Sequence, residues 1–369
     1  MEPANRNLRG YIPLAAPLNW EPVTGEESPL RLVIGFTTNW FSRRAGIDFR
    51  KPFHENPAFR FESLLRMKRY VHETFPEIAY FREHDTGGFE QECATLSGLY
   101  GACLVGMLYG LEPVYYQNNW PAIRPEHHLS AEEVKKLKPF HLESLPLVGN
   151  LVRQMDIIEK NWGKIDGYVN FQGVLNNAFK IRGTEIFTDM YDDPELCHFL
   201  FEHITDTMIR LSKLIFRRQC ASGFPIDSLG ISNCTVNLIS PADYRMFVLP
   251  YDKRLSMSFS RHGIHSCNWV LDPYARDFST VGKIGYIDFG FASDLSLIKA
   301  CFPEARREVF YDPMFLHRKS PEEVRRDIEK IYRELAPCDL CLPDVDLMIP
   351  DEKVKMFANV AASVLTDQQ

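Results

Sequence analysis

The chain has 369 residues, of which 45% are hydrophobic and 25% are charged. These fractions are those of an ordinary globular protein, so they exclude global disorder, a collagen-like repeat and a continuous coiled coil. The 42 basic residues are outnumbered by 49 acidic ones, and the net charge is −7. Because binding to a phosphate backbone needs a basic excess, we expect no nucleic-acid partner.

The compartment is predicted from the start of the chain and from its longest apolar stretch. Residues 1–5, Met-Glu-Pro-Ala-Asn, lack the basic and apolar regions of a secretory signal. The stretch 96–111 is rich in glycine and too short for a confident membrane span. We therefore expect a cytoplasmic protein with no membrane partner, in which thiols stay reduced. Its nine cysteines are then packing residues, metal ligands or nucleophiles.

The first half of the chain predicts an irregular start followed by alternating strands and helices. Residues 1–30 are rich in Pro and Asn and show no clear period, so we predict an N-terminal extension before a single domain at 31–369. Apolar runs predict strands at 32–36 and 77–81. Helical spacing predicts helices at 61–74, 93–109 and 146–161, and a capping box predicts another helix start at Ser130.

The second half repeats this alternation more regularly. Strands are predicted at 167–171, 228–232, 263–267, 284–289, 308–311 and 339–342. Helices are predicted at 193–218, after the caps at Ser240 and Asp294, at 320–335 and from Pro350. Roughly eight strand–helix units predict an α/β protein with the (β/α)8 TIM-barrel fold. No Gly-x-Gly-x-x-Gly follows an early strand, which argues against a dinucleotide-binding sheet.

His265 and Cys267 are the first candidates for chemistry. Two residues apart on a strand, they would point to the same face. At the carboxyl rim of a barrel, where reactive groups gather, they would supply two of the three ligands of a catalytic zinc site. A chance pair remains the alternative, because His-x-Cys alone is a weak pattern.

Cys341 is the predicted third ligand, since it ends the last strand and barrel closure would bring that end to the same rim. Cys338 is the competitor, although it should lie deeper or toward the opposite rim. Cys301 ends a helix and belongs on the wrong side. We expect the remaining cysteines to be buried packing thiols: Cys93, Cys103, Cys197, Cys220 and Cys234.

Other polar residues also follow predicted strands, and each alone is more often a turn or cap residue than a catalyst. Asp312, Tyr311 and Asp85 are the candidate proton donors. Asn170, Asn233 and Trp269 are the candidate substrate-binding residues. Together with nearby aromatic rings they predict an apolar mouth with a few polar groups, suited to a small aromatic or methylated substrate.

Several stretches resemble the uroporphyrinogen decarboxylase superfamily, whose fold is a (β/α)8 barrel. The resemblance runs from about Asn39 to the end and is strongest after Gly167. The matching stretches are 173–183 with Glu185 and 192–195, 238–241 with 249–251, 265–267, and 341–357.

The resemblance separates two branches. The decarboxylases carry an N-terminal Gly-Arg-Tyr segment, and the nearest stretch here, 42–46, does not match it. They also carry a Tyr at the position of Phe179. Asp85 matches their catalytic Asp only loosely. The corrinoid-dependent methyltransferases carry a His-x-Cys and a distant Cys as zinc ligands, which His265, Cys267 and Cys341 match in type and order. Asn268 replaces the usual Gly, and Cys341 stands two residues out of register. Residues 49–67 resemble bacterial members that demethylate aryl methyl ethers.

This resemblance implies an enzyme that moves a methyl group between a small methylated substrate, a methoxylated aromatic above all, and the cobalt of a corrinoid. It implies zinc as a Lewis acid on the substrate heteroatom and a separate corrinoid protein as partner; family members are often homodimers. The alternatives are a tetrapyrrole decarboxylase and a methylcobalamin:thiol methyltransferase.

Overall fold

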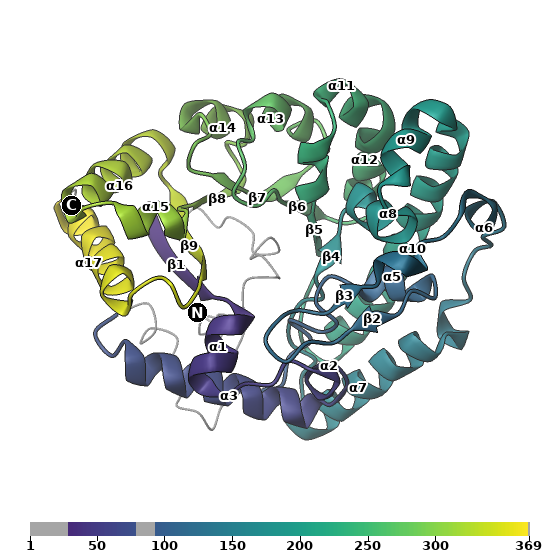
Figure 1. Cartoon of the computed structure of the whole chain (residues 1–369), viewed down its shortest axis with the longest axis horizontal. Helices are drawn as coiled ribbons and strands as arrows, with labels where there is room; N and C mark the ends of the chain where they lie inside the picture. The colour runs from purple at the N-terminus through teal and green to yellow at the C-terminus, as the bar shows by residue number, and fades with distance from the viewer. Residues whose placement is uncertain (1–28, 79–92, 368–369) are drawn as a thin grey trace.

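The computed structural model describes residues 29–78 and 93–367, in which seven strands form one parallel sheet. The strands are β1 (Leu30–Phe36), β4 (Phe171–Gln172), β5 (Ser228–Ser232), β6 (Arg261–His265), β7 (Ile284–Gly290), β8 (Arg306–Phe310) and β9 (Cys338–Val345). Their order in space is β1-β9-β8-β7-β6-β5-β4. The first strand pairs with the last, with Leu32 opposite Leu340. This pairing of chain ends is what a barrel requires, and Figure 1 shows the strands curving around a central axis.

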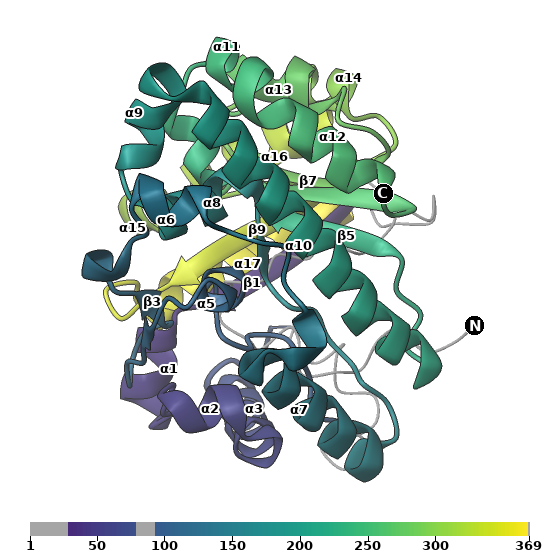
Figure 2. The same cartoon turned by 90° about the vertical axis from the view of Figure 1, so that its right-hand side faces the viewer.

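Helices surround the strands on the outside (Figures 1 and 2). Those before β5 are α1 (Thr38–Ala45), α2 (Lys51–Glu55), α3 (Pro57–Thr74), α5 (Leu104–Leu108), α6 (Ala131–Lys135), α7 (Pro146–Trp162), α8 (Val174–Arg182), α9 (Glu185–Asp192) and α10 (Pro194–Ala221). Those after β5 are α11 (Pro241–Asp243), α12 (Leu249–Met257), α13 (Asp272–Phe278), α14 (Leu295–Cys301), α15 (Pro313–Arg318), α16 (Pro321–Leu335) and α17 (Asp351–Asp367). The short strands β2 (Pro113–Val114) and β3 (Ala122–Ile123) form a separate pair. The predicted α/β barrel is confirmed.

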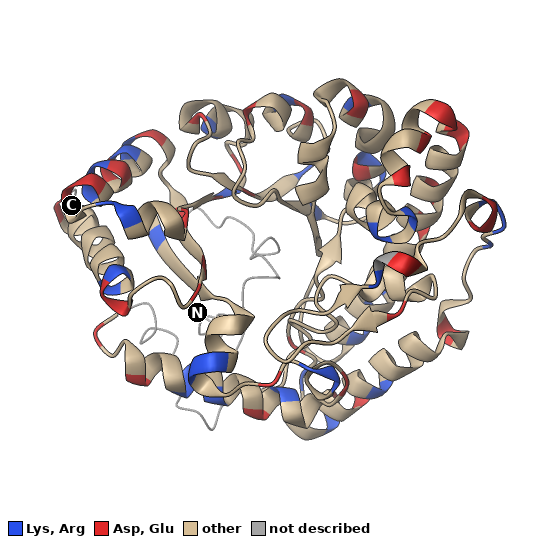
Figure 3. Cartoon of the chain, viewed as in Figure 1, with Lys and Arg blue, Asp and Glu red and all other residues tan. Residues whose placement is uncertain are grey.

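The apolar core lies between the strands and the helices. In α16, for example, Val324, Ile328, Ile331 and Leu335 recur every three or four residues, and all are fully buried. That spacing places them on one helix face, which packs inward. On the outer face acidic and basic residues are interspersed (Figure 3). None of the helices in the described ranges is both long enough and apolar enough to cross a membrane.

The interior of the barrel is polar beside β8 and β9. Arg306 of β8 and Arg31 of β1 both donate to the carboxylate of Asp339 on β9, at 2.5 and 2.9 Å. One layer nearer the carboxyl rim, the hydroxyl of Tyr286 lies 2.6 Å from the carboxylate of Glu308. Buried ionic groups of this kind need partners to offset their desolvation, and here the facing strands supply them.

Two predicted elements are much shorter in the structure than expected. The predicted helix 93–109 is helical only over Leu104–Leu108, because Gly98, Tyr100 and Gly101 adopt left-handed φ of 78°, 56° and 52°. Of the predicted strand 167–171 only Phe171 lies in a strand, β4, and Gly167 has a left-handed φ of 98°. Residues 79–81 of one predicted strand, and 1–28 of the predicted extension, lie outside the described residues.

Candidate metal centre and cavity

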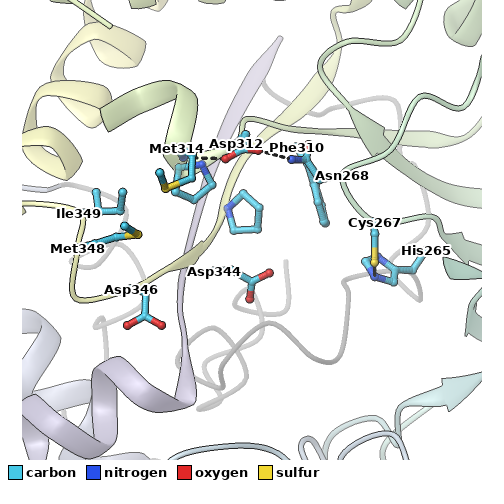
Figure 4. Close-up of a pocket in the computed structure, with 12 residues that line it drawn as sticks. His265, Cys267, Asn268, Phe310, Asp312, Met314, Asp344, Asp346, Met348 and Ile349 are labelled. Carbon is cyan, nitrogen blue, oxygen red and sulfur yellow. Dashed lines mark hydrogen bonds between the residues drawn. The ribbon is translucent and has the colours of Figure 1, made fainter. Parts of the chain in front are cut away.

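A cavity of about 380 Å³ opens at the carboxyl ends of the strands. Three loops line it, those that follow β6, β8 and β9 (Figure 4). The described lining residues are His265, Cys267, Asn268, Phe310, Asp312, Pro313, Met314, Pro343, Asp344, Asp346, Met348 and Ile349. This is the end of a barrel at which enzymes of this fold bind substrate, and the volume suits a small molecule.

Cys234 meets His265 and Cys267, two of the residues that line this cavity. Their ligand atoms all lie within 4.8 Å of one another. The two sulfurs are 2.8 Å apart, and the sulfur of Cys267 lies 2.9 Å from Nε2 of His265. Among the described residues, these three side chains form a group of His, Cys, Asp or Glu that lies close enough together to bind one metal ion.

A tight turn after β6 creates this arrangement. His265 is the last residue of β6, whereas Cys267 lies beyond the strand with a left-handed φ of 64°. The expectation that both side chains project from one strand face is therefore wrong, although they do meet. The amide of Ser266 donates to Asp288 at 2.7 Å, and its hydroxyl donates to the Asp288 carbonyl at 2.8 Å. These two bonds hold the turn against β7.

Cys234 reaches the cluster from the neighbouring strand. It begins a short 3₁₀ helix, Cys234–Leu238, directly after β5, and β5 pairs with β6 so that Ser232 lies opposite His265. The amide of Asn233 donates to the carbonyl of His265 at 2.7 Å. The expectation that Cys234 is a buried thiol in a helical apolar run is thus wrong, because it is only partly buried and follows β5 at the carboxyl rim.

A buried carboxylate orients His265. Nδ1 of His265 lies 2.6 Å from Oδ2 of Asp288, which is fully buried on β7. Tyr286 of the same strand has its hydroxyl 3.0 Å from that oxygen and 2.6 Å from Glu308. With Nδ1 held by a carboxylate, Nε2 is the nitrogen that faces the two sulfurs. Histidines that bind metals are commonly held in this way.

The cluster is strongly coupled electrostatically. The hydrogen bond between the two thiols lowers the pKa of Cys234 and raises that of Cys267, so the pair shares one negative charge. Burial alone would lower the pKa of His265, but the carboxylate of Asp288 and the two sulfurs together raise it. The site therefore favours an ionised sulfur beside a charged imidazole, which a metal ion would replace with a direct bond.

The donor set fits zinc. Thiolate and imidazole are the ligands that zinc prefers, and three protein ligands leave a fourth position open for substrate. The two sulfurs, now 2.8 Å apart, would have to separate to admit the ion.

The structure places Cys341 and Cys338 away from this cluster. Cys341 is fully buried inside the barrel, where it packs with Val33 and Phe310. Burial and the neighbouring carboxyl of Glu308, which accepts a hydrogen bond from this thiol, raise the pKa of Cys341. Cys338 begins β9, so it lies toward the opposite rim.

The candidate proton donors are placed differently from one another. Asp312 lines the cavity, but its two oxygens accept bonds from the Met314 amide at 2.7 Å and from Nδ2 of Asn268 at 3.0 Å. The buried hydroxyl of Tyr311 donates to Asp327 of α16 at 2.6 Å and does not line the cavity. Asp85 lies outside the described residues.

The candidate substrate-binding residues are engaged within the protein. Oδ1 of Asn170 accepts from Ser232 at 3.2 Å, and Nδ2 of Asn233 donates to Asp252 at 2.8 Å. The ring of Trp269 packs edge-on against Tyr274 at 5.3 Å. None of the three is among the described lining residues of the cavity. Their contacts support the loops that carry Cys234 and Cys267.

Sequence reasoning missed Cys234 and Asp344 as site residues and did not assign Asp288 its role beside His265. The available signal was position: Cys234 directly follows Asn233, which was already placed at the rim, and Asp344 follows the last predicted strand by two residues.

Comparisons with known proteins agree with this architecture. The sequence model described as Uroporphyrinogen decarboxylase (URO-D) matches residues 100–338, nearly two thirds of the chain. The chain belongs to the uroporphyrinogen decarboxylase family. A curated uroporphyrinogen decarboxylase from Synechococcus sp. (strain CC9902) is 28% identical over 133 residues, and one from Syntrophotalea carbinolica is 35% identical over 81 residues. The first match covers 34% of this chain and 36% of the relative, and the second covers 22% of each. This chain therefore aligns with only a part of the length of either relative.

A solved structure shows the same fold over almost the whole chain. A methyltransferase from Methanosarcina mazei matches with a TM-score of 0.65 and 16% sequence identity, covering 96% of this chain and 98% of that one. At this identity the likeness shows the fold alone.

Proposed function

We propose that this chain is a corrinoid-dependent methyltransferase. It would move a methyl group between a small methylated substrate, with methoxylated aromatics as the first class to test, and the cobalt of a corrinoid held by a partner protein. The observation that carries the proposal is the convergence of Cys234, His265 and Cys267 at the carboxyl rim, beside a cavity that His265 and Cys267 line.

In this proposal Cys234, His265 and Cys267 hold a zinc ion. Zinc bound there would supply a Lewis acid to the oxygen or sulfur of the substrate. Asp288 keeps Nε2 of His265 directed at the site by holding Nδ1. The apolar wall formed by Phe310, Met314, Met348 and Ile349 would exclude water from the methyl group.

Exposed apolar side chains around the mouth support a large protein partner. They lie in the segments that follow β5, β6, β8 and β9: Leu238, Val270, Phe315, Leu347 and Met348, each between 42% and 65% exposed. Exposed apolar side chains that gather around a cavity often mark a docking surface, whereas scattered ones do not.

The homodimer and the cytoplasmic location stay predictions.

The rival function is decarboxylation of a tetrapyrrole, which the family and both curated relatives favour. Against it, the described residues that line the cavity include Asp312, Asp344 and Asp346 and no Lys or Arg, whereas a polycarboxylate needs cations. Incubation with uroporphyrinogen and a search for coproporphyrinogen decides between the two.

A methylcobalamin:thiol methyltransferase would use the same centre in the opposite direction. The same three residues would hold the zinc ion, and the thiol substrate would take the place of the methyl ether. Supplying the methylated corrinoid protein with a thiol, and measuring methyl thioether, tests this direction.

The test of the proposed function combines metal analysis with an anaerobic assay. We expect about one zinc per chain, and loss of zinc in Cys234→Ala and in Cys267→Ala. Methylation of a Co(I) corrinoid protein is then compared with methanol, methoxylated aromatics and methylamines as donors. Cys338→Ala, at the far end of β9, is the matched control and should keep its zinc.

Cys341→Ala decides the third ligand. Full zinc content in this variant supports Cys234, whereas zinc loss with Cys234→Ala still loaded would transfer the role to Cys341. Wild-type protein that contains no zinc and transfers no methyl group would refute the proposal.

A further inference from the structure

Among the described residues, Asp344 is the cavity carboxylate without a hydrogen-bond or ion-pair partner. It projects into the cavity between the His265–Cys267 side and the Met348–Ile349 side (Figure 4). No hydrogen bond or ion pair links it to the described residues. Burial raises the pKa of Asp344, His265 lowers it, and the neighbouring Asp346 raises it further. An ionisable side chain left without a partner inside a cavity is available to a ligand.

A bulge in β9 turns the side chain of Asp344 into the cavity. Along β1 the register advances from Ile34 to Phe36, while along β9 it advances from Leu342 to Val345, so β9 carries one extra residue. Asp344 lies in this bulge and has a left-handed φ of 49°. Bulges redirect side chains and are common beside active sites, and residues other than glycine adopt such φ values at a cost.

The other two cavity carboxylates are held by the protein itself. Asp312 accepts from Met314 and Asn268, as described above. Asp346 accepts from Nδ2 of Asn39 at 2.9 Å and from the amide of Leu347 at 2.6 Å. All of these donors are neutral groups, so they do not pair either carboxylate with a positive charge. The cavity therefore contains three carboxylates and, among its described lining residues, no Lys or Arg.

A bound zinc ion would leave this negative field in place. Two thiolates balance the charge of a divalent ion, and His265 is already paired with Asp288. Lys180 of α8 acts electrostatically on Cys234 but does not line the cavity. Field lines in a cleft with apolar walls are focused, so the carboxylates act strongly on a charged ligand.

We propose that the cavity selects small methylated compounds that carry an ammonium group, that Asp344 receives this group, and that carboxylated analogues are rejected. The ring of Phe310 and the side chains of Met314 and Met348 would pack against the apolar body of such a ligand. This inference deepens the proposed function and rests on it for the methyl group.

The test uses three probes that share one scaffold and differ in charge: 3-methoxybenzylammonium, 3-methoxybenzyl alcohol and 3-methoxybenzoate. Binding to the zinc-loaded full chain is measured by ligand-observed NMR and calorimetry without any corrinoid protein. We expect the ammonium probe to bind at least about tenfold more tightly than the benzoate, with the alcohol between them, and the gap to shrink with added salt.

Asp344→Asn tests the residue assigned. Asparagine tolerates left-handed φ, so the bulge is retained while the charge is removed. We expect the ratio of ammonium to benzoate affinity to fall by about tenfold. Asp192→Asn is the matched control, since this exposed residue ends α9 away from the cavity and removes the same net charge. It should leave the ratio unchanged.

Three results overturn the inference: equal or tighter binding of the benzoate, an unchanged ratio in Asp344→Asn, and no binding of any probe at millimolar concentration. Because the assay does not depend on methyl transfer, it separates the two ideas. A clear ammonium preference without transfer to Co(I) would refute the proposed function and leave the binding selectivity intact. Transfer from the benzoate as efficient as from the ammonium probe would refute the selectivity alone.

Discussion

His262 should make the stability of the barrel sensitive to mild acid. It is the second residue of β6 and is fully buried, and neither of its ring nitrogens has a hydrogen-bond partner among the described residues. Side chains alternate along a strand, so His262 faces the helices while Gly263 and His265 face the interior. Burial lowers the pKa of His262 from 6.5 to about 4. The folded protein therefore holds this imidazole neutral.

The sign of the effect follows from the two pKa values. His262 becomes protonated below pH 6.5 in the unfolded chain, but only below about pH 4 in the folded chain. The contribution of the neutral imidazole to stability is therefore complete above pH 6.5 and is lost as the pH falls between the two values. Integrating this difference from pH 7 to pH 5 gives a loss of about 2 kcal/mol from this one residue. That is a large share of the stability of a typical protein.

His262→Phe isolates this contribution. Phenylalanine keeps the planar ring and removes both nitrogens, so the unfolding free energy of the variant should fall about 2 kcal/mol less than that of the wild type between pH 7 and pH 5. Urea denaturation at the two pH values measures this, with equal m-values as the check that the unfolding transition is unchanged. Equal losses in the two proteins would refute the reasoning.

Two further predictions concern the metal centre. Asp288→Asn should weaken zinc binding about 10–100-fold in competition with a chelator, because it exchanges the carboxylate that holds Nδ1 of His265 for an amide; unchanged affinity would contradict the orienting role. Gly173→Ala should lower both zinc content and thermal stability, because the added Cβ would lie 1.8 Å from Oδ1 of Asn233, next to Cys234. A Gly149→Ala variant, where the new Cβ meets only the end of Arg153 at 3.9 Å, is its control. It lies within α7, so it should keep its zinc and be at least as stable as the wild type.

Elements with a strong local pattern were predicted closely. The strand 228–232 matches β5 residue for residue, and the helix 320–335 matches α16 apart from its capping residue. In α16 the capping box at Ser320 and the regular apolar spacing agree, so local and tertiary preferences coincide. The helix predicted at 93–109 was wrong over most of its length. Its apolar residues are buried as expected, but two of its glycines adopt left-handed turns, which the spacing of apolar residues cannot reveal.

The candidate site was predicted only as far as one strand end. His265 and Cys267 were singled out by their spacing, and they do meet. Their contact depends on the left-handed turn at Cys267 and on Asp288 of the next strand, neither of which the spacing contains. Cys234 was set aside because an isolated thiol in a sequence has no neighbours to distinguish it from a packing residue.

The sequence by itself therefore determined the class of fold, the family, and a His-x-Cys pair at a strand end. These features depend on periodicity and short motifs, which involve only residues that are close together in the chain. The tertiary structure decided which distant residues join that pair. Cys234 meets it because β5 lies beside β6, and Cys341 points into the barrel interior toward Glu308. One extra residue in β9 turned Asp344 into the cavity. Strand order and register set such meetings, and both arise only when the sheet closes.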